Sequence, residues 1–465
     1  MKALLAIFFV FAFTSLWAQD TPKELTLDEF AALVKSGHPI ARQAQLQLEL
    51  GQLQLLKAKG GADPKAFTEL NQKQYTGKEY YSILDAGLTI PTWYAVSFEA
   101  GFEQNRGSYL NPENTTPATG LYHAGASLPL GKGLFIDERR AALRQAELFS
   151  QLTEAEQRQL LNDLLLDAGA AYWRWFRAYN NLKVFEDANK LAQQRFTAVK
   201  MGASLGDRPA IDTLEAGIQV QTRQVQLESA KLEVKNAQAY MEVFLWQDGQ
   251  IPLELDDETI PQEKESLIYA TEITSFLTND SLILNHPEYA QALLKLKSLE
   301  IDNRLKKEQL KPQLDLKYNA ISGFTGTADD ALGFDNYTWG VKFSMPIFLR
   351  KERGDLRINK VKIEQTQRAL DQKQATLNLK VEMSFNEWQT TTELINIQQN
   401  TVRDYKDLLA GERALFNQGE SSLFMVNSRE MNYIQSQVKL NDLVGKRFES
   451  ELKVKHALGI LTDTF

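Results

Sequence analysis

The sequence predicts a mainly helical protein with a smaller β portion, built from two copies of one structural unit. Three observations predict this fold class: helical stretches of unusual length, short runs that alternate polar and apolar residues, and landmarks that recur in both halves. Each unit reads helix, strand, loop, strand, very long helix, short turn and returning helix. Repetition on this scale indicates a duplicated supersecondary unit within one chain.

The landmarks of the repeat are histidine–proline pairs and strand-ending prolines. His38-Pro39 opens a helical segment in the first half, and His286-Pro287 opens one in the second. Two intervals from a strand end to a helix end both measure 73 positions: Pro129 to Gly202, and Pro346 to Gly419. We therefore predict a first structural repeat at 19–250, a linker at 251–280, and a second repeat with the C-terminus at 281–465.

Long coiled-coil helices are predicted from apolar residues spaced seven apart. Between residues 350 and 418 the sequence has no proline, and its heptad positions are Val381, Trp388, Ile395, Val402, Leu409 and Phe416. An earlier series is offset by a four-residue stutter: Leu356, Ile363, Leu370 and Leu377. The first unit keeps the same spacing at Leu161, Ala168, Trp175, Leu182 and Phe196, with Asn189 interrupting the apolar series. Sustained heptads indicate coiled-coil packing, and roughly 68 residues at ~1.5 Å each give a rod of about 100 Å.

Short alternating runs predict two pairs of strands. Residues 93–102 and 121–130 form the first pair, and residues 314–318 and 339–345 form the second. Alternation of this kind, rich in aromatic residues, is typical of membrane barrel strands, but a soluble antiparallel sheet has the same pattern. The segment 62–91 is compatible with an extra hairpin, which has no counterpart in the second unit and which we leave unplaced.

The N-terminus is predicted to be a secretory signal peptide, residues 1–18. Lys2 precedes the apolar run 3–17, and Ala18 is a small residue at the cleavage position. The run is shorter than the ~20 residues that a helix needs to cross a bilayer. Beyond it the sequence has no apolar stretch of that length, a property that secreted soluble proteins share with membrane proteins built from strands.

Composition argues against catalysis and against a nucleic-acid partner. The net charge of −8 provides no basic face for nucleic acid. The chain has no cysteine, which excludes disulfides, thiolate metal sites and cysteine nucleophiles. The four histidines lie far apart in the sequence, and no phosphate loop, serine nucleophile motif or pair of catalytic carboxylates stands out. We therefore predict no enzyme activity, no metal and no cofactor.

The second helical turn resembles that of the outer membrane efflux protein family, typified by TolC. Arg413 is followed by Gly419 and a short polar turn, and the segment closes with Ala457-Leu458-Gly459. The first unit offers Arg195 and Gly202 in the corresponding place. The likeness extends over nearly the whole chain after the signal peptide, because the order of the repeated elements also matches.

This resemblance implies a homotrimer in the outer membrane, with a long periplasmic portion. Each chain would give four strands to a shared 12-stranded outer-membrane β-barrel and long antiparallel coiled-coil helices to a periplasmic α-barrel. Four strands cannot close a barrel alone, since bacterial barrels have about eight or more, so several chains must pool their strands if these enter lipid. The resemblance further implies a passive exit duct for small molecules, opened by a periplasmic adaptor protein and an inner-membrane pump.

By the same resemblance, the two turns between the long helices are the functional sites. The residues that would contact the adaptor at the periplasmic tips are Gly202, Ala203, Ser204, Leu205, Asp207, Gly419, Glu420, Ser421, Ser422 and Leu423. The carboxylates that would constrict the pore are Asp207, Asp212, Glu420 and Glu430. This chain departs from the family pattern at Met425 and Ser428, where acidic residues are common. Helix capping alone also explains Gly202 and Gly419, and the helix dipole alone explains Glu420.

Two other functions stay open at the level of sequence. A type I secretion channel for polypeptides has the same architecture, and the cargo is chosen by the pump rather than by the duct. An exported coiled-coil scaffold, a protein of a different class, would have the same rods but would fold its strands into a soluble sheet. Heat-resistant trimers and conductance in planar bilayers distinguish a channel from a scaffold.

Overall fold

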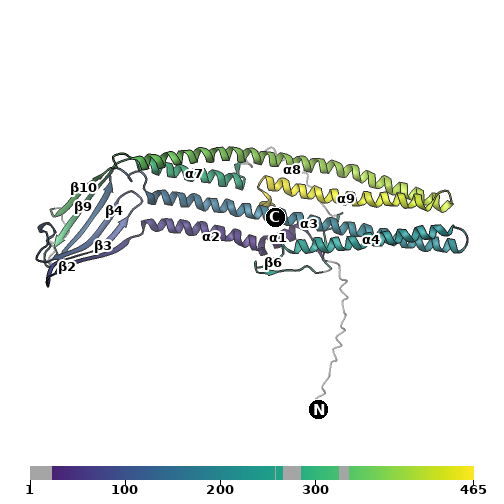
Figure 1. The fold of residues 1–465 in the computed structure, drawn as a ribbon, viewed down its shortest axis with the longest axis horizontal. Coiled ribbons are helices and arrows are strands. Elements are labelled where there is room, and N and C mark those ends of the chain that lie inside the picture. Colours follow the sequence, from purple (N-terminus) through teal and green to yellow (C-terminus); the bar gives the residue numbers. More distant parts are fainter. Residues whose placement is uncertain (1–22, 257, 265–283, 324–334) are drawn as a thin grey trace, which may run out of the picture.

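The protein is an elongated bundle of helices with a curled sheet at one end (Figure 1). The computed structural model describes residues 23–256, 258–264, 284–323 and 335–465. The predicted signal peptide and residues 265–280 of the predicted linker lie outside the described residues. The described helices are α1 (Leu27–Gly37), α2 (Pro39–Lys59), α3 (Glu138–Ser204), α4 (Ala210–Glu242), α7 (Pro287–Glu308), α8 (Arg350–Gln418), α9 (Leu423–Ala457) and α10 (Leu461–Thr464).

Equivalent helices of the two halves begin in the same way. His38 and His286 are the N-caps of α2 and α7, and each is followed by a proline at the first helical position. In both, the histidine Nδ1 accepts a hydrogen bond from the backbone N–H two residues on, at 3.1 Å. The side chain thereby satisfies one of the free N–H groups at the helix start, and proline supplies the φ that the first turn needs.

The helices nearest the sheet form a single row in the order α2, α3, α7, α8 (Figure 1). Farther from the sheet, α3 pairs with α4 and α8 pairs with α9. The predicted heptad positions of α8 face these neighbours, since Val381, Trp388, Ile395, Leu409 and Phe416 are all buried. Among the described helices, none combines the length and the apolarity that crossing a lipid bilayer requires.

The main hydrophobic core lies around the middle of α3, where the rod is thickest. Trp175 and Phe176 are buried there against Val444 and Leu452 of α9. Tyr172 donates a hydrogen bond to the carbonyl of Leu25 at 2.8 Å, so the buried phenol ties the N-terminal segment to the core. Burial raises the pKa of Tyr172, because the charged phenolate would lose its hydration.

A six-stranded antiparallel sheet closes the other end of the molecule. Its order is β10-β9-β5-β4-β3-β2, and its strands are β2 (Lys65–Tyr75), β3 (Lys78–Pro91), β4 (Ser97–Arg106), β5 (Leu121–Pro129), β9 (Gln313–Gly323) and β10 (Tyr337–Ser344). Every neighbouring pair is antiparallel. Four short strands pair outside this sheet: β1 (Glu24–Leu25) with β8 (Ile260–Pro261), and β6 (Trp246–Gln247) with β7 (Ile251–Pro252).

The structure confirms the fold class of long helices plus strands but corrects the number of strands. We predicted four strands per chain, and the sheet contains six. The difference is the β2–β3 hairpin, formed by the segment that the sequence left unplaced. A bulge between Lys73 and Gln74 breaks its register. In β3 the neighbours Ile83 and Leu84 are both apolar but lie on opposite faces, and Gly87 has no side chain, so the alternation is weak along the chain.

One face of the sheet is mainly apolar and the other is mainly polar, and this difference extends across all six strands. Residues directly opposite one another in antiparallel strands share a face, so the register assigns every position. One face carries large apolar side chains, among them Leu70, Leu84, Leu88, Phe98, Phe102, Tyr122, Leu128, Leu316, Tyr318, Trp339, Val341 and Phe343. The other carries Glu69, Asp85, Glu99, Glu103, His123, Lys317, Asn319 and Lys342.

A buried histidine at the start of α7 makes the fold sensitive to acid. His286 is 1% exposed, and a Cβ added to Gly459 would lie 2.9 Å from the imidazole Cδ2, so the ring is tightly enclosed. Burial lowers the pKa of His286 to about 4. The unfolded chain, with an ordinary histidine pKa near 6.5, therefore binds the extra proton between these values.

The stability that neutral His286 contributes is thus complete above about pH 6.5 and is lost as the pH falls towards 4. We expect the His286→Asn variant, which keeps a side-chain acceptor for the N–H of Glu288, to lose less thermal stability than the parent between pH 7 and pH 4.5. Thermal unfolding of the detergent-purified protein at a series of pH values measures this. Parallel curves for parent and variant would contradict it.

Candidate functional site

The two turns that join the long helices lie side by side at the end of the bundle opposite the sheet (Figure 1). The first turn, residues 205–209, connects α3 to α4, and the second, residues 419–422, connects α8 to α9. All ten residues predicted to contact an adaptor lie in these turns or in the adjoining ends of the helices. The paired turns are therefore the candidate site.

The first turn is shaped by Gly206 rather than by Gly202. Gly202 lies within the last turn of α3, and Gly206 has the left-handed φ of +84°. The N–H of Asp207 donates to the carbonyl of Gly202 at 2.9 Å, which ties the turn back to the helix. Our prediction that Gly202 ends the helix was thus displaced by two residues, since α3 continues to Ser204.

The second turn is a left-handed helix cap. Gly419 has φ +81°, a conformation that glycine adopts without the Cβ penalty of other residues. The N–H of Glu420 donates to the carbonyl of Leu415 at 2.9 Å, and the side chain of Ser422 accepts from the N–H of Met425 as the N-cap of α9. Ser421 and Glu412 are hydrogen bonded through their side chains. The reversal is therefore completed within four residues.

A small apolar core holds the two turns together. It consists of buried residues from all four helices at this end: Val199, Ala216, Leu409, Phe416, Leu423 and Val426. Leu423, predicted as a contact residue, is only 2% exposed and belongs to this core. Arg208 of the first turn places its guanidinium 4.0 Å from the ring centroid of Phe416 in α8, a cation–π contact that joins one hairpin to the other.

Behind the turns lies an ion cluster, which we call the tip ion cluster, of Glu430, Arg195, Arg223 and Arg413. The Glu430 carboxylate in α9 is ion-paired and hydrogen bonded with Arg195 of α3. It also accepts from Nη2 of Arg413 in α8 at 3.1 Å, and its Oε1 lies 3.9 Å from Nε of Arg223 in α4. One carboxylate thereby contacts all three neighbouring helices.

Three of the four members of the tip ion cluster are shielded from solvent, whereas the side chain of Arg413 is 37% exposed. The side chains of Glu430 and Arg223 are 3% and 4% exposed, and that of Arg195 is 14% exposed. Burial lowers the pKa of Arg223, although the negative charge of Glu430 acts in the opposite direction. A buried charge is costly unless it is paired, so each arginine depends on the same carboxylate.

Asn427 extends the cluster towards the first hairpin. Its amide oxygen accepts from Nη1 of Arg195 at 2.9 Å, and its amide nitrogen donates to Glu215 of α4 at 3.0 Å. The sequence motif had drawn attention to Arg195 and Arg413 only as markers of the turns. Arg223 and Asn427 carry no local sequence signal, because their partners are distant in the chain.

The four carboxylates predicted to constrict a pore occupy different environments. Asp207 and Glu420 are exposed on the two turns, and Asp212 is half-buried in the first turn of α4. Glu430 is buried, at 2% exposure, and belongs to the tip ion cluster. Among the described residues, the recorded ion pairs connect Glu430 but none of the other three to an arginine.

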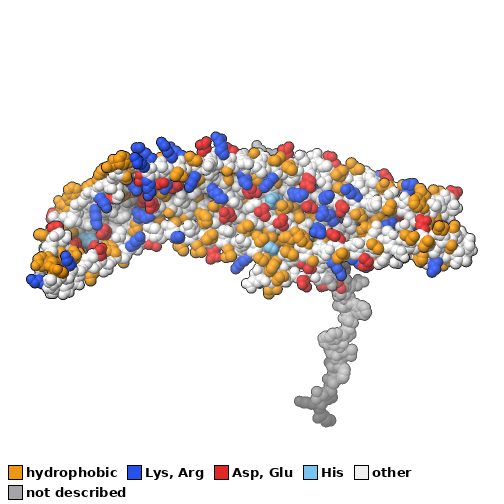
Figure 2. Space-filling view, in the orientation of Figure 1, with side chains coloured by type: hydrophobic (Ala, Val, Ile, Leu, Met, Phe, Trp, Pro, Cys, Tyr) orange, Lys and Arg blue, Asp and Glu red, His pale blue; other side chains and the backbone are white. Residues whose placement is uncertain are grey.

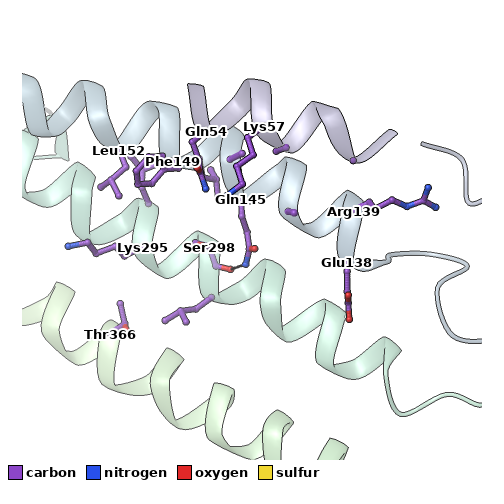
Figure 3. Close-up of a pocket in the computed structure, with 17 residues that line it drawn as sticks. Gln54, Lys57, Glu138, Arg139, Gln145, Phe149, Leu152, Lys295, Ser298 and Thr366 are labelled. Atoms are coloured by element: carbon purple, nitrogen blue, oxygen red, sulfur yellow. Dashed lines mark hydrogen bonds between the residues drawn. The ribbon is translucent and has the colours of Figure 1, made fainter. Parts of the chain in front are cut away.

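A large cleft lies elsewhere, between the helices next to the sheet (Figure 3). It has a volume of 870 Å³ and is lined by α2, α3, α7 and α8. Phe149, Leu152 and Leu294 give it an apolar wall, and Nε2 of Gln145 donates to the carbonyl of Ser298 at 3.4 Å. Its charged groups, Lys57, Glu138, Arg139 and Lys295, stand at its margins (Figure 3).

Comparison with known proteins gives a family match for part of the chain and a shared fold for nearly all of it. Residues 279–460 match the family model described as Outer membrane efflux protein. A comparison with curated protein sequences gives no match. Among solved structures, the chain is similar to the CmeC outer membrane channel of Campylobacter jejuni, with 15% identity, a TM-score of 0.62, and 99% of this chain and 94% of that chain covered.

Two further structures have the same fold. The outer membrane protein VceC of Vibrio cholerae is 13% identical with a TM-score of 0.65, covering 93% of this chain and 96% of that chain. The MtrE outer membrane channel of Neisseria gonorrhoeae is 14% identical with a TM-score of 0.65, covering 93% and 88%. The whole chain thus has the fold of outer membrane channels, and residues 279–460 match the model of the outer membrane efflux protein family.

Proposed function

We propose that the protein is the exit duct of a tripartite efflux pump, a passive conduit for small molecules. In this proposal three copies assemble around a common bore. Their sheets lie in the outer membrane, their helices cross the periplasm, and the paired turns meet a periplasmic adaptor and an inner-membrane pump. We also propose the division into two structural repeats, 19–250 and 281–465, joined by the segment 251–280.

The observation that carries this proposal is the polarity of the sheet. Trp339 and Phe343 on its apolar face are 65% and 67% exposed in the single chain, and hydrophobic side chains gather along the sheet end in the space-filling view (Figure 2). An exposed apolar surface of this extent marks a contact with lipid or protein. A polar opposite face, where Nζ of Lys317 lies 2.9 Å from Oε2 of Glu99, suits a water-filled interior.

The same observation disfavours an exported scaffold with a soluble sheet, because such a sheet would leave its aromatic face in water. Aromatic residues also stand at both ends of the strands. Tyr94 and Phe348 lie near the helices, and Tyr75 and Tyr109 lie near the distal loops. Aromatic residues favour the two interfaces of a bilayer. Their placement supports a sheet that spans a membrane.

The proposed function is tested with the purified full-length protein. We expect it to require detergent for solubility, to have the mass of three chains plus bound detergent, and to conduct ions across planar bilayers. A strain lacking the protein should accumulate small toxic molecules, and the restored protein should reverse this. A detergent-independent, non-conducting monomer would refute the proposal.

The exposed carboxylates of the turns are proposed to line the entrance at the tips. Replacing both Asp207 and Glu420 with alanine is expected to weaken block of the open pore by multivalent cations several-fold, because two negative charges per chain leave the entrance. Single-channel recordings with a trivalent cation on the tip side measure the block. Glu393→Ala, in the exposed surface of α8 far from the turns, is the control, and unchanged block in the double variant would show that these carboxylates do not line the pore.

A further inference from the structure

The β2–β3 hairpin continues the wall of the sheet rather than leaving it. Leu70 on β2 pairs with Leu84 on β3, and Leu88 pairs with Ala100 on β4, so the apolar face runs on without a change of side. On the polar face, Glu69 pairs with Asp85, which pairs with Glu103. A hairpin that served as a plug or a periplasmic flap would not need faces that match the polarity of the adjoining strands. The match therefore favours a hairpin that is part of the sheet.

The edges of the sheet coincide with the edges of the helix row. The outermost strands are β2 and β10, and they connect directly to the outermost helices, α2 and α8. The outermost strands of each chain therefore continue into the outermost helices of the same chain (Figure 1). A neighbouring copy that places its α2 beside α8 also brings its β2 beside β10.

Both edge strands are open and suited to each other. In the described part of the chain, neither has a second strand partner, and the residues of both are exposed along nearly the whole strand. Neither strand contains proline, and the bulge of β2 at Lys73 lies at the end of that strand farther from the helices, so residues 65–72 keep a regular edge. Because β2 runs away from the helices and β10 runs towards them, the two strands of adjacent copies would be antiparallel.

The widths of the two layers also agree. A row of four helices at ~8–10 Å per helix occupies about 32–40 Å of circumference. Six strands spaced ~4.8 Å apart and tilted by ~40° occupy about 38 Å, whereas four strands occupy only about 25 Å. With six strands, the sheet therefore matches the width of the rod to which it is joined.

We propose that adjacent copies pair β10 with β2, so that three copies of this six-stranded sheet form one closed barrel of 18 strands. The proposal rests on the trimeric channel proposed above for its number of copies. The diameter of a barrel grows roughly linearly with strand number, so the bore is about 1.5 times as wide as that of a 12-stranded barrel. The occupant of each open edge is a second copy of this chain.

Charge on the polar face is complementary across this seam. Lys342 lies on the polar face of β10, and Glu69 lies on the polar face of β2. When the helix-side ends of the two strands, Ser344 and Lys65, are aligned, Lys342 lies opposite Phe67 and Glu69 lies opposite Gly340, so the two charges are diagonal neighbours on the polar face. Opposite charges near one another on one face stabilise a strand pair and disfavour slippage of its register.

Engineered disulfides test the seam, because the chain has no native cysteine. Glu69→Cys is combined in turn with Thr338→Cys, Gly340→Cys and Lys342→Cys, which share the polar face of β10. A Cβ at Gly340 meets no atom within 4 Å, so that substitution is sterically free. We expect one pair to crosslink most of the protein into a covalent trimer on a non-reducing gel, since paired strands place opposite Cα atoms about 5 Å apart.

Two controls make the result decisive. Glu103→Cys on β4, combined with the same β10 positions, tests a 12-stranded barrel from which the β2–β3 hairpin is excluded. Asn319→Cys with Thr338→Cys, which pair within one chain, shows that oxidation succeeds. Two results would overturn the 18-stranded barrel: a crosslink between Glu103→Cys and β10, or no crosslink with Glu69→Cys although the intrachain control disulfide forms. Neither result would contradict the trimeric channel. A purified complex whose mass is not that of three chains overturns the strand total and also the proposed trimer.

Discussion

Replacing Glu430 with glutamine is expected to lower the free energy of unfolding by about 3–5 kcal/mol, the usual effect of removing one partner from a buried ion pair. Glutamine keeps the shape of the side chain and one acceptor oxygen but removes the charge. The Arg195 and Arg223 side chains, 14% and 4% exposed, would then be buried without a full negative charge beside them. Arg413 contributes less, because its side chain is 37% exposed and is screened by water.

The same variant is expected to open the tips of the proposed duct. Glu430 joins α9 to α3 and α4, so its charge holds one helical hairpin against the other. Without it, we expect the channel to spend more time open in planar bilayers, together with a lower midpoint of thermal unfolding in detergent. Glu393→Gln, an exposed substitution in α8, is the matched control. A Glu430→Gln channel with the conductance and stability of the parent would show that the tip ion cluster does not restrain the hairpins.

The sequence predicted those parts of the fold that depend on local or periodic patterns of residues. The heptads of α8 predicted the buried residues Trp388 and Ile395, and the histidine–proline pairs marked the start of α2 and α7. These signals depend on residues a few positions apart. The β2–β3 hairpin was not placed because strand pairing is a long-range property, and its alternation is interrupted by Gly87 and by the bulge at Lys73.

The candidate site was predictable only in part, for the same physical reason. The spacing from an arginine to a glycine located both turns, but it did not show which glycine adopts the left-handed conformation. Gly206 does so in the first turn, where the additional residues before Pro209 lengthen the loop. Nor did spacing show that Arg195 and Arg413, 218 positions apart in the sequence, share the carboxylate of Glu430.

Replacing Trp388 with alanine is expected to lower the free energy of unfolding by about 3–5 kcal/mol, the range for truncating a buried tryptophan. Its side chain is 8% exposed in α8 and belongs to a buried cluster with Val454 of α9 and Leu458, the residue that follows α9. The guanidinium of Arg447 lies 5.6 Å from its ring centroid, so the variant also removes an aromatic face from a buried cation. The structure places this heptad position between two helices of one chain.

The loss should therefore appear in the unfolding of the chain itself and not only in the lifetime of the oligomer. Met383→Ala, which truncates a side chain 63% exposed on the same helix, is the control and should change stability little. Trp388→Phe, which keeps an aromatic ring in the site, should lose less than the alanine variant. Thermal and denaturant unfolding in detergent measure all three. If Trp388→Ala dissociated the assembly but left the unfolding of each chain unchanged, the residue would act between copies, and the packing of α8 on α9 would not depend on it.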